Sequence, residues 1–359
     1  TVYVFEYRLS RQLVTQLPGK GSRLLDHLGL QDCAIRSWYE QLLISNEGST
    51  HSRMRSAIAK RFTAWSLRQY TEIANTIIRA ALQGLIAKRE GDLVDMMRYV
   101  PIRLMSRILG VPDEDVFRLL PYVEDIESLS RKTAQELTRA ESSLSSLLQY
   151  FERLLECKRS HPSNDLISSI ALDCDGRLTQ AEMIAFATNM LAISHEPLLS
   201  QICCSLYSLL QQSNEFLTAE ISHGRIHHVV EESIRLEPSI DYADRIVVEP
   251  IEIGGIIRKP GTLILCSLAA ANRDPLAWND PENFMPTRFL RATCPRVLTF
   301  GGGIHHCLGS ALVRLTISEI VRCLFINFSP SLKVPPEQLE WMSTLASRPT
   351  TLPVVVAAT

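Results

Sequence analysis

Apolar residues return every three or four positions, with charged residues between them, from about Arg53 to Glu237. This spacing predicts a series of amphipathic helices. Gly110, with Pro112 behind it, is expected to end one helix, and the polar segment 161–165 to separate two more. The helical segments are RMRSAIAKRFTAW (53–65), LRQYTEIANTIIRAALQGLIAKRE (67–90), LVDMMRYVPIRLMSRILG (93–110) and AESSLSSLLQYFERLLECKR (140–159).

After Pro238 the pattern changes to short β-type runs separated by turns. A proline-rich irregular section runs from Pro275 to Pro295, a last helix follows at 310–325, and a short strand is expected near the C-terminus. There is no internal repeat and no linker-like segment. We therefore expect a mainly α fold with a small β portion, organised as a single domain over residues 1–359.

Composition narrows the class of protein. The chain has 37 Lys and Arg against 39 Asp and Glu, so no overall basic field favours nucleic acid or an anionic membrane. Its apolar stretches are too short for a membrane span and its start lacks a signal-peptide layout, which favours a cytoplasmic protein. The sequence does not begin with Met, so further residues are expected upstream. Nine scattered cysteines, an odd number, argue against a disulfide framework.

One apolar segment, from Leu178 to Gln212, reads as a single long buried helix, yet it contains the stretch LAISHEPLLS (191–200). A proline inside a helix removes one backbone hydrogen bond and clashes with the carbonyl four residues back, at a cost of about 3 kcal/mol. Pro197 therefore predicts a bend near Ile193.

A second segment, TFGGGIHHCLGSALVRL (299–315), precedes the last helix. Zinc does not suit it, because adjacent side chains cannot converge on one tetrahedral ion and no CxxC or HxxxH partner lies nearby. Three consecutive glycines allow positive φ and let the backbone pass close to a flat object. Cys307 stands just ahead of a helix N-terminus, where the dipole and free N–H groups favour a thiolate. Such a thiolate suits an axial ligand of haem iron.

The loop resembles the cysteine-ligand loop of the cytochrome P450 family, F-x-x-G-x-[HR]-x-C-x-G. Its fixed positions correspond to Phe300, Gly303, His305, Cys307 and Gly309. The resemblance implies that Cys307 is the axial thiolate ligand of heme b, that His305 faces a haem propionate and that Phe300 packs near the sulfur. Gly309 completes the cofactor-binding motif.

Other landmarks of the family occur in the expected order. Glu232 and Arg235, three residues apart, would alone read as an ordinary surface pair. In the family such a pair is completed by a later arginine, here Arg288, and the three form a buried structural network. Further propionate partners implied by the resemblance are His51, Arg55 and Arg245. The resemblance covers nearly the whole chain and is closest to soluble bacterial-type members. It suggests that several dozen N-terminal residues are missing.

The distal helix of the family carries [AG]-G-x-[DE]-T-T over the haem, which falls on residues 193–198 here. Glu196 keeps the acid, but Pro197 replaces the first threonine and cannot hold a proton-delivering water through a hydroxyl. Ser194, Glu196 or a substrate hydroxyl are the candidates to organise water near the freed Ile193 carbonyl. His195 is expected to face solvent or a neighbouring helix, and for Glu196 both readings stay open.

We expect the pocket walls to include Asn189, Ile193, Ile240 and Tyr242, a mostly apolar set that favours a lipophilic, natural-product-like substrate. Electrons would come from a ferredoxin-type donor with its reductase, meeting basic residues on the cysteine side. The candidates are Lys60, Arg61, Arg296 and Arg314. A monomer is expected.

The resulting prediction is a haem-thiolate monooxygenase that inserts one oxygen atom from O₂ into a lipophilic small molecule. Because Pro197 removes the usual alcohol, non-hydroxylating oxidation such as coupling, desaturation or a peroxide-driven reaction is the alternative. A non-catalytic haem-binding scaffold is the third reading.

Overall fold

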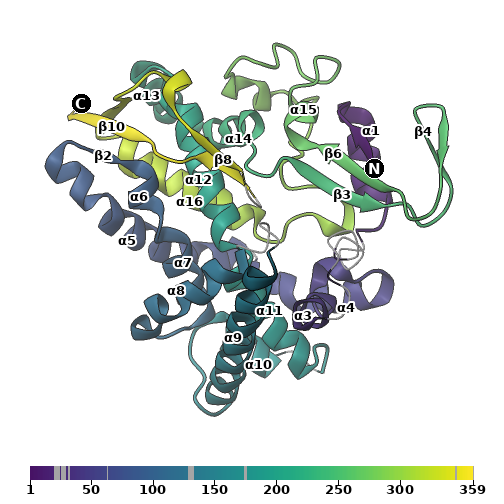
Figure 1. Ribbon diagram of the computed structural model, residues 1–359. Coiled ribbons are helices and arrows are strands. Elements are labelled where there is room, and N and C mark those ends of the chain that lie inside the picture. The colour runs from purple at the N-terminus through teal and green to yellow at the C-terminus, as the bar shows by residue number, and fades with distance from the viewer. Residues whose placement is uncertain are drawn as a thin grey trace.

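The structure is a computed structural model and describes residues 1–19, 25, 30, 33–62, 64–127, 133–173, 176–343 and 346–358. Helices dominate the described chain (Figure 1). They are α1 (Tyr7–Gln16), α3 (Ala34–Glu40), α4 (Gly48–Ala59), α5 (Ala64–Lys88), α6 (Leu93–Met97), α7 (Val100–Leu109), α8 (Asp113–Glu127), α9 (Ala134–Ser160), α10 (Leu166–Asp173), α11 (Gln180–Ala192), α12 (His195–Leu210), α13 (Asn214–Ser222), α14 (Ile226–Leu236), α15 (Leu268–Asn272) and α16 (Ser310–Phe325).

The strands among the described residues form two three-stranded sheets and two two-stranded pairs. Strand order is β1-β6-β3 in one sheet, with β1 parallel to β6, and β2-β10-β7 in the other, which is antiparallel throughout. The two-stranded pairs join β4 with β5 and β8 with β9. The strands are β1 (Val2–Val4), β2 (Glu90–Asp92), β3 (Tyr242–Ile246), β4 (Ile251–Ile253), β5 (Ile256–Arg258), β6 (Leu263–Ser267), β7 (Phe328–Leu332), β8 (Trp341–Ser343), β9 (Ser347–Pro349) and β10 (Pro353–Ala358).

Helix α12 occupies the centre of the molecule. It packs against α7, α14 and α16, and nearly all its side chains are buried. A helix that is apolar on all sides is stable only when it is surrounded by protein. In Figure 1 the helices α7 to α11 gather below α12, and β3, β6 and α1 lie to its right. The mainly α fold with a small β portion is thus confirmed.

Two expected helices are divided in the structure. The segment 93–110 forms α6 and α7, because Pro101 occupies the second position of a new helix, where its missing N–H leaves no bond unmade. The segment 178–212 forms α11 and α12, so the expectation of one long helix is wrong. Gly110 does end α7, with φ +83°, and the segment 161–165 separates α9 from α10.

A buried ion network joins α14 to the irregular section after α15. The Glu232 carboxylate accepts two hydrogen bonds from Arg235, both at 2.8 Å, and one from Arg288 Nε at 2.9 Å. Their side chains are 0%, 0% and 6% exposed. Both guanidiniums also donate to backbone carbonyls between 272 and 283 and lie over the Trp278 ring. Each guanidinium nitrogen and each carboxylate oxygen of this network therefore has a partner, as burial of charge requires.

None of the helices described is long and apolar enough to cross a membrane.

Replacing Glu232 by alanine should destabilise the protein by about 3–5 kcal/mol, because two buried guanidiniums lose their counter-charge. Urea unfolding measures the change. The matched control is Arg322→Ala, which breaks a pair with Glu319 at a position where the arginine side chain is 49% exposed and should cost less than about 1 kcal/mol. Equal losses in the two variants would contradict the structural role of the network.

Candidate functional site

The loop between Thr299 and α16 turns sharply at two glycines. Gly301 has φ +68° and Gly303 φ +66°, a backbone region that other residues rarely adopt. A Cβ at Gly303 would also lie 2.8 Å from the Thr15 carbonyl oxygen of α1, so only glycine fits there. The Cys307 N–H donates to the Phe300 carbonyl at 3.0 Å and closes the loop.

The Cys307 side chain lies just before the N-terminus of α16. It is reachable from solvent, yet burial among protein atoms raises the pKa of its thiol. Hydrogen bonding from the N–H groups of Gly309 and Ser310, and the positive charges of Arg314 and Arg55, act in the opposite direction. These donors favour the thiolate, and they are the groups that would stabilise sulfur as a metal ligand.

Two arginines brace this loop. Arg314 lies over the Phe300 ring, 4.4 Å from its centroid, and pairs with Glu231 at 2.5 Å. Arg55 of α4 donates to the carbonyls of Ile304 and His306, both at 2.9 Å. Arg55 therefore supports the loop backbone, a role that the sequence did not suggest.

The predicted propionate partners lie around the same loop. His51 is buried, its ring lies edge-on to His305 at 4.9 Å, and its Nε2 has no partner among the described residues. Arg245 donates to the Val14 and Asp244 carbonyls, but its Nε is likewise buried without a partner in the described chain. Two buried nitrogens that lack acceptors fit a group that brings acidic oxygens.

His305 has a partner that sequence reasoning missed. Its Nε2 lies 2.7 Å from Glu47 Oε1, and the same oxygen accepts the Gly19 N–H at 2.7 Å. Gly19 approaches so closely that a Cβ there would lie 3.0 Å from the His305 ring. No motif marks Glu47, because the contact joins residues far apart in the chain.

The bend predicted at Pro197 is a complete break between two helices. Helix α11 ends at Ala192, Ile193 and Ser194 have φ near −90°, and α12 begins at His195. Pro197 thus lies in the first turn of α12, not in a helix interior. The first turn has no intrahelical acceptor for its N–H groups, so the proline costs far less there than expected.

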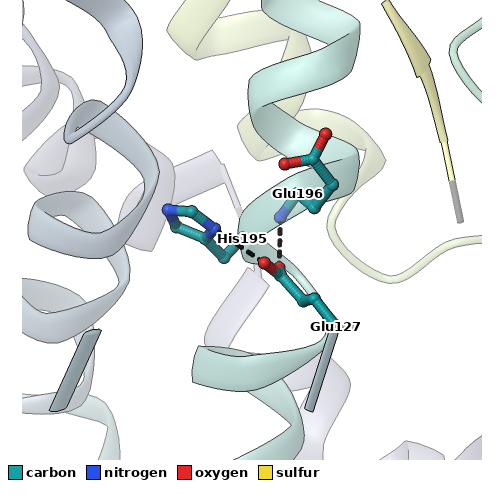
Figure 2. A group of neighbouring side chains, drawn as sticks. All are labelled: Glu127, His195 and Glu196. Carbon is teal, nitrogen blue, oxygen red and sulfur yellow. Dashed lines mark hydrogen bonds and ion pairs between the residues drawn. The ribbon is translucent and has the colours of Figure 1, made fainter. Parts of the chain in front are cut away.

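Glu127, the last residue of α8, caps this break. Its Oε1 accepts the Glu196 N–H at 2.6 Å, and its Oε2 lies 3.3 Å from His195 Nδ1 (Figure 2). His195 therefore faces a neighbouring helix, one of the two surroundings expected for it. Glu127 could not have been found from the sequence, since it is one of several acids on α8.

Glu196 is buried and paired. Its Oε1 accepts hydrogen bonds from Ser200 Oγ and from Arg348 Nε of β9, each at 2.9 Å. In Figure 2 its carboxylate points away from Glu127, along α12. Glu196 is therefore paired with Arg348, a partner that the sequence did not identify.

The predicted pocket residues differ in their surroundings. Ile193 and Ile240 are half-buried and pack against the main core, and Asn189 is half-buried with no described residue bonded to its side-chain amide. Tyr242 is 40% exposed and meets Tyr3 of β1 edge-on at 5.8 Å. Their roles in binding stay predictions.

Of the predicted basic contacts for an electron donor, Lys60 and Arg296 are exposed. Arg61 is buried and donates to Ser169 and to the Ala57 carbonyl, so its place on a docking surface is wrong. Arg314 is half-buried in its contacts with Glu231 and Phe300.

The chain belongs to the cytochrome P450 family. The family description "Cytochrome P450" matches residues 226–354, which include the ion network and the cysteine loop. The family carries haem held by a cysteine thiolate, and its named relatives are monooxygenases, so the protein is an oxidoreductase of this type.

Two relatives and one solved structure illustrate the similarity. Nocardicin C N-oxygenase of Nocardia uniformis subsp. tsuyamanensis is 32% identical over 320 residues, covering 87% of this chain and 78% of the relative. The 6-deoxyerythronolide B hydroxylase of Saccharopolyspora erythraea is 26% identical over 348 residues, covering 96% and 84%. The structure of CalO2 superposes with a TM-score of 0.89 at 22% identity, over 99% of this chain and 90% of that chain, which shows a shared fold.

Replacing Gly303 by alanine should destabilise the cysteine loop by more than about 2 kcal/mol, because a left-handed residue is strained and its Cβ meets the Thr15 backbone. Gly301→Ala is the matched control, since its φ is similar but the space around it is open, and about 1 kcal/mol is expected. Urea unfolding and haem retained after gel filtration measure both. A Gly301 variant as damaged as the Gly303 variant would disprove the role of the contact.

Proposed function

We propose that Cys307 is the axial thiolate ligand of heme b in a monooxygenase that acts on a lipophilic natural product. The observation that carries this proposal is the reachable Cys307 thiol backed by the N–H groups of Gly309 and Ser310. Bound there, haem would supply O₂ activation, with the thiolate donating electron density that favours O–O cleavage.

The chain's own residues would hold the cofactor in defined ways. His51 Nε2 and Arg245 Nε are the buried donors left for propionate oxygens, with Arg55 and His305 beside the same loop. Phe300, held under the Arg314 guanidinium, would shield the sulfur from water. Gly309 leaves its N–H free to donate to that sulfur.

The substrate class is argued from the pocket and from the relatives. Ile193 and Ile240 offer apolar surface, and the unbonded Asn189 amide can fix one polar group of a substrate. The relatives named above, and Mycinamicin IV hydroxylase/epoxidase of Micromonospora griseorubida, carry the names of natural products. We infer a substrate of that kind.

The electron donor is proposed to be a ferredoxin-type protein that meets a groove beside α1. The groove has a volume of about 910 Å³ and is lined by α1 and by residues 274, 276–277 and 292–296, with Arg8, Arg11 and Arg296 all exposed on it. Thr15, which also lines it, contacts Gly303 of the cysteine loop. The three arginines outnumber the two acids that also line the groove, Glu6 and Asp274, so its net charge is positive and suits an acidic donor. The exposed Lys60 is proposed as an additional contact.

Pro197 favours a second candidate function, in which the protein couples or desaturates its substrate or uses peroxide instead of reduced O₂. Product formation with NADPH, ferredoxin and its reductase, compared with peroxide alone, separates the two candidates. A non-catalytic scaffold would form no product in either case.

The reduced protein should give the carbon-monoxide difference band of thiolate-bound haem, and Cys307→Ala should lose it, because no thiolate remains at that position. Cys294→Ala, which changes a half-buried cysteine outside the loop, is the control and should keep the band. A Cys307→Ala protein that retains the band would rule out the ligand assignment. With the wild-type protein, compounds that shift the Soret band then identify ligands.

Changing Arg8, Arg11 and Arg296 together to glutamine should slow electron transfer from a ferredoxin by about tenfold at low salt, with little effect above 0.5 M salt, because exposed charges act mainly through screened attraction. Stopped-flow reduction under carbon monoxide measures the rate. Exposed arginines away from the groove, Arg98 and Arg118, serve as controls. An unchanged rate in the triple variant would exclude the groove as the docking site.

A further inference from the structure

Glu127 holds the start of α12 from a different helix. The ligand atoms of Glu127, His195 and Glu196 lie within 4.8 Å of one another, and Figure 2 shows the Glu127 carboxylate between the His195 ring and the backbone of Glu196. Pro197 has no N–H to satisfy, and Glu127 Oε1 accepts the N–H of Glu196, the residue before it. One carboxylate thereby fixes the backbone where α11 and α12 separate.

His195 and Glu127 are placed to exchange a proton with each other. His195 is 4% exposed, its Nδ1 faces Glu127, and its Nε2 is buried without a partner among the described residues. Burial raises the pKa of the Glu127 carboxyl, against the opposing effect of His195. The Glu127 side chain is 11% exposed, so solvent can still reach it.

Two other unpaired polar atoms lie on helices that pack against α12. Thr188 Oγ1 on α11 and Ser106 Oγ on α7 are also buried without partners in the described chain. Helix α7 packs against both α11 and α12, so the three orphaned atoms belong to helices in mutual contact. Buried polar atoms of this kind are normally satisfied by ordered water.

Glu196 is less suited to moving protons. Its Oε1 atom already accepts hydrogen bonds from Arg348 Nε and Ser200 Oγ. The same pairing argues against a metal ion among the three residues, because an ion would have to compete with Arg348 for Glu196 and with a backbone N–H for Glu127.

We propose that Glu127 is a positioning residue for the break before α12, and that with His195 it holds the exchangeable proton that an alcohol at position 197 would otherwise hold. Glu196 then has a structural role. This inference rests on the proposed function, since it concerns proton supply during O₂ reduction.

The transfer balances at named atoms. His195 releases a proton from Nε2 to water and takes one at Nδ1 from the Glu127 carboxyl, which is reprotonated from solvent. Without an organic substrate, O₂ takes two electrons and two protons to form hydrogen peroxide, or four of each to form two waters. Electrons come from NADPH through the ferredoxin. Impaired proton supply shifts the product toward peroxide.

The test uses the purified holoenzyme with NADPH, ferredoxin, its reductase and O₂ alone. Glu127→Gln keeps an oxygen for the Glu196 N–H but cannot donate an acidic proton. The rate of water formation is the rate of NADPH consumption minus the rate of peroxide release. We expect this rate to fall about tenfold, with an altered solvent isotope effect. His195→Gln should behave alike. Glu124→Gln, an exposed position on α8 paired with Arg98, is the matched control and should match the wild type.

Hydrogen exchange of the 194–199 backbone tests the capping role separately. Glu127→Ala should raise exchange there about fivefold, as loss of a cap does, whereas Glu127→Gln should not. Wild-type peroxide yield in Glu127→Gln, or damage found only in Glu196→Gln, would overturn the proton role. Unchanged exchange in Glu127→Ala would overturn the capping role. If the wild-type protein lacked the carbon-monoxide band of thiolate-bound haem, the proposed function and the proton role would both be wrong. The capping role of Glu127, tested by hydrogen exchange, would be unaffected.

Discussion

The buried carboxylate of Glu232 is the interaction on which the cysteine side of the molecule depends. It is completely buried and serves Arg235, Arg288 and the Met285 N–H at once. Because an unpaired charge there would be very costly, the irregular section 272–290 has little freedom to take another path. A segment with almost no regular structure is thereby made rigid, and this explains why so many prolines and exposed loops can coexist with a defined site.

A chain of three hydrogen bonds connects this network to the cysteine loop. Arg235 holds the Asn272 carbonyl, the Asn272 amide donates to Thr299 Oγ1, and Thr299 donates to the Ile234 carbonyl of α14. Thr299 immediately precedes Phe300 and the glycines, so the loop starts from a fixed point. Its far end is fixed by α16, and α1 presses on Gly303 between the two. The position of Cys307 therefore follows from contacts that involve no cofactor.

The sequence was informative where chemistry is local and uninformative where it is not. Apolar periodicity was sufficient for most helices, because neighbouring residues determine it. The Glu232 network, which joins Arg288 across 56 positions, was found through the family's motifs and is confirmed, whereas the ligand role of Cys307 stays a prediction. Glu47, Glu127 and Arg348 could not be predicted, since each meets its partner across 69 to 258 positions of the chain. Arg61 was misplaced for the same reason: nothing local showed that α10 would cover it.

Pro197 illustrates how an apparent defect becomes a constraint on function. A threonine at this place would bring both a hydroxyl and another N–H that needs an acceptor in the first turn of α12. Proline removes both, so the single Glu127 carboxylate can satisfy the Glu196 N–H and still face His195. The loss of the alcohol and the arrival of a carboxylate from α8 are thus two parts of one arrangement. The same hydrogen bond connects the end of α8 to the break between α11 and α12, so a movement of that end would shift the start of α12.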